Sequence, residues 1–542
     1  MIRNIFLLGL SILFFSCNSQ KQADLIVHNA VVYTVDDKFS IAEAFAIKDG
    51  KILETGSSEE ILKKYKGEML DAGGKAVYPG FIDGHSHFYG YGEGLQQADL
   101  VGTKSWEEIL EKLQQFGNEN SEGWIIGRGW DQNDWAIKEF PDNIKLNELF
   151  PNRPVILTRI DGHAAIANKT ALDLAGLKSG QKITGGEVET INGKLSGILV
   201  DNAQGAAYAK IPEQNLAQIK ESLMDAQKNC FAAGLTTVTD CGISHKLVPV
   251  ITELQQNKQL KMRIYAMLSD DLENFDFLFK NGAIKTDRLN VRSFKVYMDG
   301  ALGSRGACLL EPYSDKPGYS GFLLSDKKHF AEVAQKIADA GFQMNTHAIG
   351  DSANREILNV YAKVLKGKND FRWRIEHAQV VNQADFRLFA ENNIVPSVQS
   401  THATSDMYWA ADRLGAERVK GAYAFKQLLD QNGWLVLGTD FPVENINPMY
   451  TFYAAVVRKD MKGYPADGYQ MENALSREEA LRGMTIWAAK GQFEEKEKGS
   501  IEAGKFADFV ILDRDIMKAD AMQLFNAQVL KTYINGENVY SK

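Results

Sequence analysis

The chain has 542 residues, of which 44% are hydrophobic and 24% charged, and its formal net charge is −9. This length suits one large barrel with a satellite domain, or several ordinary domains. No basic cluster is present, so the charge gives no reason to expect a nucleic-acid ligand. We expect a small molecule or a neutral polymer as the substrate, and the sequence leaves open whether the protein is an oligomer.

Residues 1–17 predict an export signal. A short basic start (1–4) precedes an apolar run (5–15) that is too short to span a membrane. Because Cys17 follows a small residue at the end of this run, the segment resembles a bacterial lipoprotein signal, and residues 18–23 would form a polar tether. We expect a membrane-anchored lipoprotein facing the periplasm or the cell surface, with membrane contact only through a lipid on Cys17. A soluble periplasmic protein or an uncleaved anchor is the alternative.

The remaining cysteines predict little covalent stabilisation. Cys230, Cys241 and Cys308 show no paired spacing. At most one disulfide is expected, so core packing must supply the stability.

The sequence patterns at both ends of the chain predict β-structure. Residues 24–78 contain short runs of alternating apolar and polar residues, with Asp49-Gly50 as a hairpin signal between two of them. Residues 491–542 have the same character. We predict one small β-sandwich domain built from 24–78 and 491–542.

The middle of the chain, residues 79–490, predicts a (β/α)8 TIM barrel, an α/β fold. Eight β-rich runs alternate with helical segments, the first of them ending near His85. The other seven run over residues 236–240, 263–267, 293–297, 343–347, 374–377, 394–398 and 434–440.

The connection after the first strand is a long insertion, at about residues 95–234. It holds the aromatic and polar residues Trp124, Trp130, Trp135 and His163. We predict that it forms a wall of the substrate pocket.

Chemically active side chains fall where the predicted strands end. His85 and His87 lie two residues apart, so on a strand they project to the same face. Lys295, His347, His377 and Asp440 close later strands. Because the catalytic residues of such barrels sit at the carboxyl ends of the strands, this mixture of imidazoles and a carboxylate predicts a site for zinc or a similar divalent ion.

Taken together, these motifs resemble the amidohydrolase superfamily, specifically its YtcJ-like and N-substituted formamide deformylase-like hydrolases (amidohydrolase family 3). The resemblance covers nearly the whole mature chain. It rests on PGFIDGHSH (79–87), DGHAAIAN (161–168), FKVYMDGALGSR (294–305), NTHAIGD (345–351), RIEHAQ (374–379), LGTDFPV (437–443) and KGSIEAGKFADFVILD (498–513).

The resemblance implies two divalent metal ions, Zn in the first place, with Mn, Fe or Co as alternatives. His85, His87 and Asp440 would hold one ion, and His347 and His377 the second. Lys295 would bridge them as a carbamate formed with carbon dioxide, which requires a buried lysine with a lowered pKa. The simpler interpretation is a Lys295 that pairs with Asp299.

The resemblance also implies an activity: a metal-bound hydroxide attacks a non-peptide amide or formamide carbon-nitrogen bond of a small molecule, with Asp440 as the proton carrier. Hydrolysis of an ester, lactone or carbamate at the same centre is an alternative. A noncatalytic solute-binding lipoprotein is a third hypothesis. No serine-nucleophile elbow is evident in the sequence.

Several residues are candidates for substrate binding: Asp161, His163, Asp299, Arg305 and His402. The alternative for Asp161, His163, Asp299 and Arg305 is that they order their own loops. Glu376 precedes His377, so strand alternation predicts that it points to the opposite face and has a structural or supporting role.

Overall fold

The computed structural model describes residues 20–120 and 122–542. The predicted signal, residues 1–17 with Cys17, lies outside the described residues. Within them no helix combines the length and the apolar character needed to cross a membrane. Of the predicted tether, residues 21–23 are not tether but the start of strand β1 (Lys21–His28), because Lys21 and Gln22 pair with the parallel strand β6 (Tyr65–Asp71).

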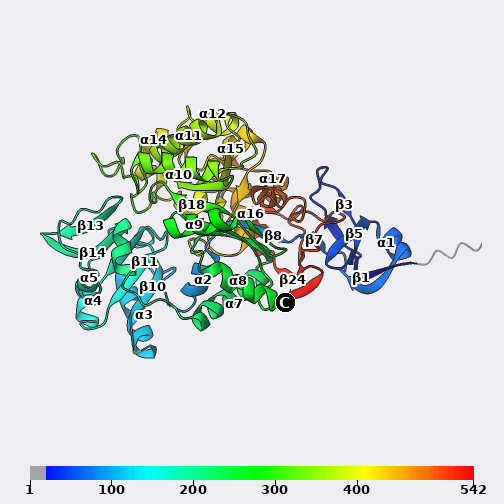
Figure 1. Cartoon of the computed structure of the whole chain (residues 1–542), viewed down its shortest axis with the longest axis horizontal. Helices are drawn as coiled ribbons and strands as arrows, with labels where there is room; N and C mark the ends of the chain where they lie inside the picture. Colours follow the sequence, from blue (N-terminus) through cyan, green and yellow to red (C-terminus); the bar gives the residue numbers. More distant parts are fainter. Residues whose placement is uncertain (1–19, 121) are drawn as a thin grey trace, which may run out of the picture.

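Eight parallel strands in sequence order form the central barrel, which confirms the predicted α/β fold class of a (β/α)8 barrel with an additional domain (Figure 1). All of the predicted runs are strands. They are β8 (Phe81–Ser86), β15 (Leu235–Ile243), β16 (Arg263–Ser269), β18 (Leu289–Tyr297), β19 (Gln343–Ala348), β20 (Arg374–His377), β21 (Val395–Val398) and β22 (Val436–Leu437).

The barrel closes between β22 and β8 through loop contacts. The Asp440 amide donates to the His85 carbonyl at 2.8 Å, and buried Asp83 accepts hydrogen bonds from the amide and hydroxyl of Thr439. A Cβ added at Gly438 would lie 2.4 Å from the His85 nitrogen, so only glycine allows this approach. The seam therefore fixes Asp440 beside His85.

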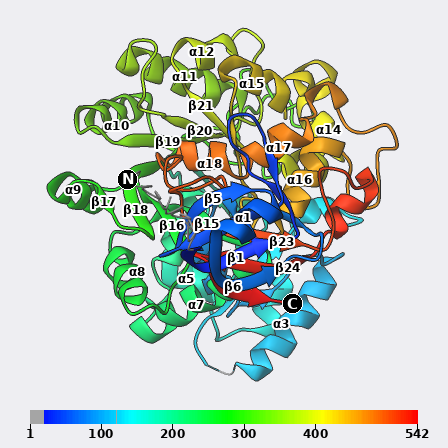
Figure 2. The same ribbon diagram turned by 90° about the vertical axis from the view of Figure 1, so that its right-hand side faces the viewer.

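Helices surround the barrel, as Figure 2 shows from the side of the domain that the two chain ends build, which is called the terminal domain below. Their apolar faces join the strands in one large core. The helices after the second barrel strand are α8 (Leu247–Gln256), α9 (Leu272–Asn281), α10 (Lys327–Asp339), α11 (Asp351–Leu365), α12 (Arg387–Glu391), α13 (Ser400–Asp406), α14 (Ala410–Arg418), α15 (Phe425–Asn432), α16 (Pro448–Val457), α17 (Arg477–Gly483) and α18 (Ile486–Gly491).

The two chain ends build a domain of two sheets packed over a shared apolar core. Asp49 and Gly50 both have positive φ and form the predicted hairpin turn between β4 and β5. The first sheet has the order β5 (Lys51–Gly56), β4 (Ala44–Lys48), β1 and β6, with α1 (Ser58–Lys64) beside it; the second has β25 (Glu537–Ser541), β24 (Val529–Ile534), β23 (Phe509–Leu512), β7 (Ala76–Pro79), β2 (Val31–Tyr33) and β3 (Ile41–Ala42).

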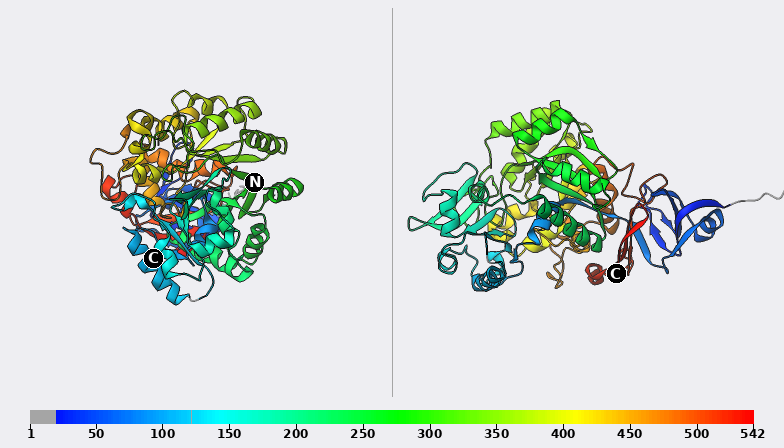
Figure 3. Two further views of the ribbon diagram at one scale, coloured as in Figure 1. Left: turned by 90° about the vertical axis from the view of Figure 1, so that its left-hand side faces the viewer. Right: turned by 60° about the horizontal axis from the view of Figure 1, so that its bottom comes forward.

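The insertion forms its own layer at the end of the barrel opposite the terminal domain (Figure 3). After α2 (Phe88–Gly94), its sheet has the order β13 (Gly186–Ile191), β14 (Lys194–Asp201), β12 (Ala164–Ala167), β11 (Val155–Arg159), β10 (Ile125–Trp130) and β9 (Ala98–Asp99); its helices are α3 (Trp106–Glu119), α4 (Ile144–Leu149), α5 (Lys169–Ala175) and α6 (Gly205–Tyr208). Helix α7 (Leu216–Ala232), which the predicted bounds of the insertion include, packs instead in the core of the barrel.

The tryptophans of the insertion do not form a pocket wall, contrary to the sequence-based interpretation. Trp130 and Trp135 are buried in the core between the sheet and α3, and Trp124 packs on the opposite apolar cluster. Indole rings bury large apolar areas, and the insertion needs them for its own core. Of the four residues predicted for the wall, His163 is the one whose ring lies beside a residue of the barrel site, His347.

Candidate metal centre

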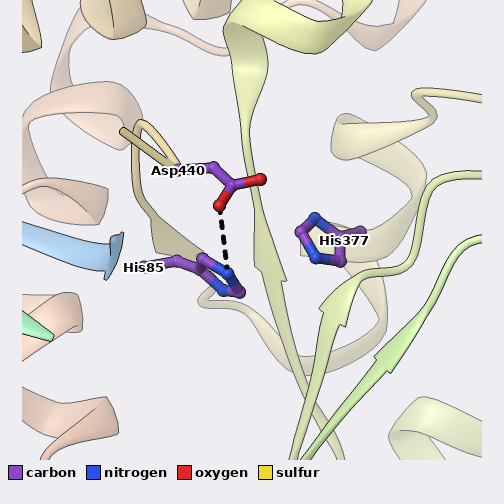
Figure 4. A group of neighbouring side chains, drawn as sticks. All are labelled: His85, His377 and Asp440. Atoms are coloured by element: carbon purple, nitrogen blue, oxygen red, sulfur yellow. Dashed lines mark ion pairs between the residues drawn. The ribbon is translucent and has the colours of Figure 1, made fainter. Parts of the chain in front are cut away.

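Three buried side chains converge at the carboxyl ends of three strands (Figure 4). His85 comes from the end of β8, His377 closes β20, and Asp440 follows β22. Their ligand atoms all lie within 4.8 Å of one another, and His85 Nε2 lies 3.5 Å from Asp440 Oδ1. Two imidazoles and one carboxylate at this spacing can hold a divalent cation.

The other predicted ligands surround this group. His87 Nε2 lies 3.3 Å from Asp440 Oδ1, and Lys295 Nζ lies 3.4 Å from His85 Nε2. The His347 and His377 ring centroids are 4.5 Å apart, while His347 Nε2 is 3.4 Å from the Gly300 carbonyl. The six predicted ligands thus lie together, but the tightest trio takes members from both of the ion sites that the resemblance implies.

Glu376 points into the barrel, so the prediction that it lies on the opposite face from the site is wrong. Its Oε2 lies 2.5 Å from His85 Nδ1. His377 has a φ of 73°, a left-handed conformation that interrupts strand alternation. Glu376 and His377 therefore both reach the centre. Asp440, with a φ of 64°, is held in the same unusual region.

Neighbouring groups orient the two central imidazoles. Arg374 holds both oxygens of Glu376 at 2.7 and 2.9 Å, and Glu376 accepts the Nδ1 proton of His85. His377 Nδ1 donates to Gln399 Oε1 at 2.7 Å. In each ring Nε2 is thereby left as the lone-pair nitrogen, which is the arrangement that metal-ligating histidines adopt, and in His85 this nitrogen faces Lys295 Nζ at 3.4 Å.

The electrostatics favour neutral imidazoles beside an ionised carboxylate. Burial, with the charge of Lys295 adding to it, lowers the pKa of His85 to about 4. Burial also holds the pKa of His347 and His377 well below the usual histidine value. Burial would raise the pKa of Asp440, but the neighbouring histidines outweigh it and hold that pKa well below its ordinary value. These are the protonation states that metal binding requires.

Several buried polar atoms of the site have no hydrogen-bond partner within the described chain. Asp440 Oδ1 and His402 Nε2 lie at the centre, and Gln399 Nε2 and Asp201 Oδ2 belong to residues that hold histidine rings. Buried polar atoms without partners are uncommon in folded proteins. A divalent cation would satisfy Asp440 Oδ1, so the residues present fit a metal ion.

Lys295 is buried, as the carbamate hypothesis requires, but its pKa is not lowered. Burial acts to lower the pKa, yet interactions with Tyr297, Cys241, Glu376 and Asp440 outweigh it and raise the pKa above the usual lysine value. The expectation of a lowered pKa is therefore wrong for the protein without metal. A divalent cation beside Nζ would favour the neutral amine, so carboxylation would be coupled to metal loading.

The insertion contributes His163 to the barrel site. The ring centroid of His163 lies 4.9 Å from that of His347, and His163 Nδ1 pairs with Asp201 Oδ1 at 2.6 Å. Asp161 instead pairs with Arg159 and accepts the His163 amide. His163 therefore faces the centre, and Asp161 shapes its loop.

The remaining substrate-binding candidates differ in position. His402 lies at the centre, with Nε2 3.7 Å from Asp440 Oδ2. Buried Asp299 accepts the amides of Cys308, Ile349 and Gly350 and so orders two loops, and among the described contacts it makes no pair with Lys295. Arg305 pairs with Asp315 at 2.9 Å. Asp299 Oδ1 also lies 3.8 Å from His347 Nε2, so Asp299 reaches the edge of the centre, whereas the substrate-binding role of Arg305 gains no support from its contact.

Asp201 and Gln399 belong to the site, and the sequence reasoning missed both. Each acts by holding a histidine ring, and neither has a fixed spacing to its partner along the chain. The available signal was position, because Asp201 closes strand β14 and Gln399 follows β21. The barrel rule for the carboxyl ends of strands covers Gln399, whereas β14 belongs to the insertion sheet and Asp201 lies outside that rule.

Comparison with known proteins agrees with this geometry. The chain is 33% identical to Protein LONG AFTER FAR-RED 3 of Arabidopsis thaliana, over 96% of this chain and 92% of that protein. It is 31% identical to YtcJ of Bacillus subtilis, which carries the name of an amidohydrolase, over 95% of this chain and 99% of that protein. It is 26% identical to the N-substituted formamide deformylase of Arthrobacter pascens, over 96% and 98%.

A solved structure shares the fold over almost the whole chain. It is an uncharacterized metal-dependent hydrolase from Pyrococcus furiosus, with 30% sequence identity, a TM-score of 0.73, and coverage of 91% of this chain and 100% of that one. The sequence pattern of the amidohydrolase family matches residues 68–540. The chain belongs to the amidohydrolase family.

Proposed function

We propose that this chain hydrolyses a carbon-nitrogen bond of a small-molecule amide or formamide, with divalent metal ions held at the barrel mouth. The observation that carries the proposal is Asp440, a buried and ionised carboxylate whose Oδ1 lies 3.5 Å from His85 Nε2 and 3.3 Å from His87 Nε2 and has no hydrogen-bond partner within the described chain. The relation to an N-substituted formamide deformylase supports the choice of bond.

The groups that would hold metal are His85, His87, Lys295, His347, His377 and Asp440. A bound divalent ion supplies Lewis-acid polarisation of the substrate carbonyl and activation of water. Asp440 is ionised at neutral pH, so it can accept a proton from the attacking water and return it to the leaving nitrogen. Glu376 and Gln399 keep the imidazoles oriented, and His163, held by Asp201, closes the site from the insertion.

The same residues weigh against a role in solute binding alone. Binding a solute needs complementary contacts, whereas a buried carboxylate surrounded by imidazoles is costly unless it holds a cation, and a metal-dependent hydrolase uses such a cation. Ester, lactone and carbamate hydrolysis use the same groups. A substrate panel that pairs each N-acyl amine with its ester analogue separates these activities.

Metal content tests the centre directly. Protein purified without chelators and with bicarbonate present should carry about two equivalents of divalent metal per chain, falling toward one or none in Lys295→Ala. The reason is the loss of the bridging group that the second ion requires. Elemental analysis of both proteins makes the measurement. Lys328→Ala, which removes an exposed lysine of α10, is the matched control and should keep the full metal content.

The other outcomes are equally informative. If the wild type and Lys295→Ala both carried one equivalent of metal, the protein would be a mononuclear hydrolase without a carbamate. A protein that takes up no metal even after reconstitution would contradict the hydrolase proposal and favour the binding protein. Metal-loaded protein is then assayed with N-formyl and N-acyl amines, and turnover of the ester analogues alone would overturn the assignment of a carbon-nitrogen bond.

A further inference from the structure

Arg128 lies on one face of the insertion sheet, at the point where that face changes from apolar to polar. In the paired strands β10 and β11, Ile126 is opposite Ile156 and Arg128 is opposite Thr158. Ile126 and Ile156 belong to an apolar cluster, whereas the Thr158 hydroxyl hydrogen-bonds the Tyr208 hydroxyl at 2.7 Å. Strand alternation thus carries Arg128 onto a polar patch at the carboxyl end of the sheet.

The guanidinium of Arg128 has no carboxylate partner within the described chain. Its Nη2 donates to the Ile160 carbonyl at 3.0 Å, while Nε is buried without any partner. Other arginines of this region are paired: Arg159 with Asp131 and Asp161, and Arg413 with Asp315. Arg128 as a residue is partly exposed, while its Nε atom is shielded from water and makes no hydrogen bond. A partly desolvated guanidinium without a counter-charge favours an anionic partner, which the described residues do not supply.

This guanidinium is placed against the loop that reaches the metal centre. A Cβ built on Gly162 would lie 3.5 Å from Arg128 Nη2 and 3.6 Å from Nη1. The next residue, His163, has its ring centroid 4.9 Å from that of His347 and 6.5 Å from that of Tyr297. Burial is the main cause that lowers the pKa of His87, and the charges of Lys295 and then Arg128 add to it. Arg128 therefore stands beside the reaction site.

We propose that Arg128 binds a carboxylate of the substrate, so that the substrate is an N-acyl or N-formyl amine with a carboxylate near its scissile bond. This inference rests on the proposed hydrolysis of a carbon-nitrogen bond and specifies its substrate class. A guanidinium offers paired donors that match the two oxygens of a carboxylate. The Arg128 guanidinium carries a single positive charge, and the charges of Asp161 and Asp440 act on it. Because these two carboxylates repel a second anion, the site suits a monoanion better than a phosphate dianion.

The test compares N-formyl amino acids with their C-terminal amides on metal-loaded protein. Each pair differs only in the carboxylate, so the ratio of the two KM values, or of the two Kd values from calorimetry where turnover is absent, isolates its contribution. The wild type should favour the carboxylate member by about tenfold to a hundredfold. Arg128→Met should lose this preference and leave the amide member nearly unchanged. Arg128→Lys should keep part of it.

Arg387→Met is the matched control, since it removes an exposed arginine of α12 and should retain the full preference. If the wild type showed the same KM, or the same Kd, for the N-formyl amino acid and for its amide, the inference would be overturned. This outcome does not depend on whether the variants fold. An Arg128→Met variant that weakens both members equally would also overturn the inference. A carboxylate preference in Kd without hydrolysis would contradict the proposed function and keep the anion site. Hydrolysis without a preference for the carboxylate would support the proposed function and overturn the role proposed for Arg128.

Discussion

In the Asp440→Asn variant, kcat should fall by about 10²-fold to 10⁴-fold, the range expected when a general acid-base group is lost. Asparagine keeps the size of the side chain and one oxygen, but it cannot take up a proton. His85 and His377 still offer Nε2, because Glu376 and Gln399 hold their other nitrogens. Metal should therefore remain, and elemental analysis beside steady-state kinetics separates the loss of chemistry from the loss of the ion.

The exposed acid Asp339 of α10 offers a control, since its side chain accepts only a bond from Gln335 on the same helix. Asp339→Asn should leave kcat unchanged. Turnover that survives in Asp440→Asn with metal still bound would show that another group carries the proton. Loss of both metal and activity would show that Asp440 is a metal ligand. Activity measured after reconstitution at a higher metal concentration would then decide its role in proton transfer.

The barrel and its ligands could be predicted because both depend on local rules. Alternation of β-rich and helical runs identifies a (β/α)8 barrel, and the carboxyl ends of its strands meet at one mouth. His85, Lys295, His347 and Asp440 each follow from this rule, since each lies at or just after the end of a strand. The turn at Asp49-Gly50 is equally local, because its two residues tolerate positive φ.

The errors arise where the tertiary structure overrides a local pattern. Strand alternation separates Glu376 from His377, yet the left-handed backbone at His377 brings both to the centre. Trp130 looks like a pocket residue in the sequence but serves the core of the insertion. The pKa of Lys295 depends on Tyr297 of the same strand and on groups from three other segments, which burial alone does not reveal.

Arg128 shows a different limit. In the sequence it is one arginine among many, and its neighbours along the chain do not distinguish it. The distinguishing feature is a missing partner, which appears only when Asp131 and Asp161 are seen to pair with Arg159 instead. Unsatisfied charge is a property of the whole fold, so it becomes visible only in the structure.

Replacement of Glu376 by glutamine should damage stability and metal binding together. Glu376 is fully buried and holds Arg374 through both oxygens, so Glu376→Gln leaves the guanidinium without its counter-charge. Breaking a buried pair in this way costs about 3 to 5 kcal/mol. The weaker acceptor for His85 Nδ1 should also reduce metal affinity by about tenfold to a hundredfold. Denaturant unfolding of the metal-free protein and a metal titration measure the two effects separately.

An exposed ion pair calibrates this result. Glu391 pairs with Arg387 on the surface of α12, and Glu391→Gln should change stability by no more than about 1 kcal/mol, because water screens the pair. If Glu376→Gln were as mild as this control, Arg374 would have to be satisfied by the Gly84 carbonyl and the Ser397 hydroxyl alone. If the metal affinity were unchanged, the orientation of His85 would come from strand β8 and from the hydrogen bonds between Asp83 and Thr439. A loss in both measurements would place the Arg374–Glu376–His85 chain at the base of the metal centre, where it links barrel stability to metal binding.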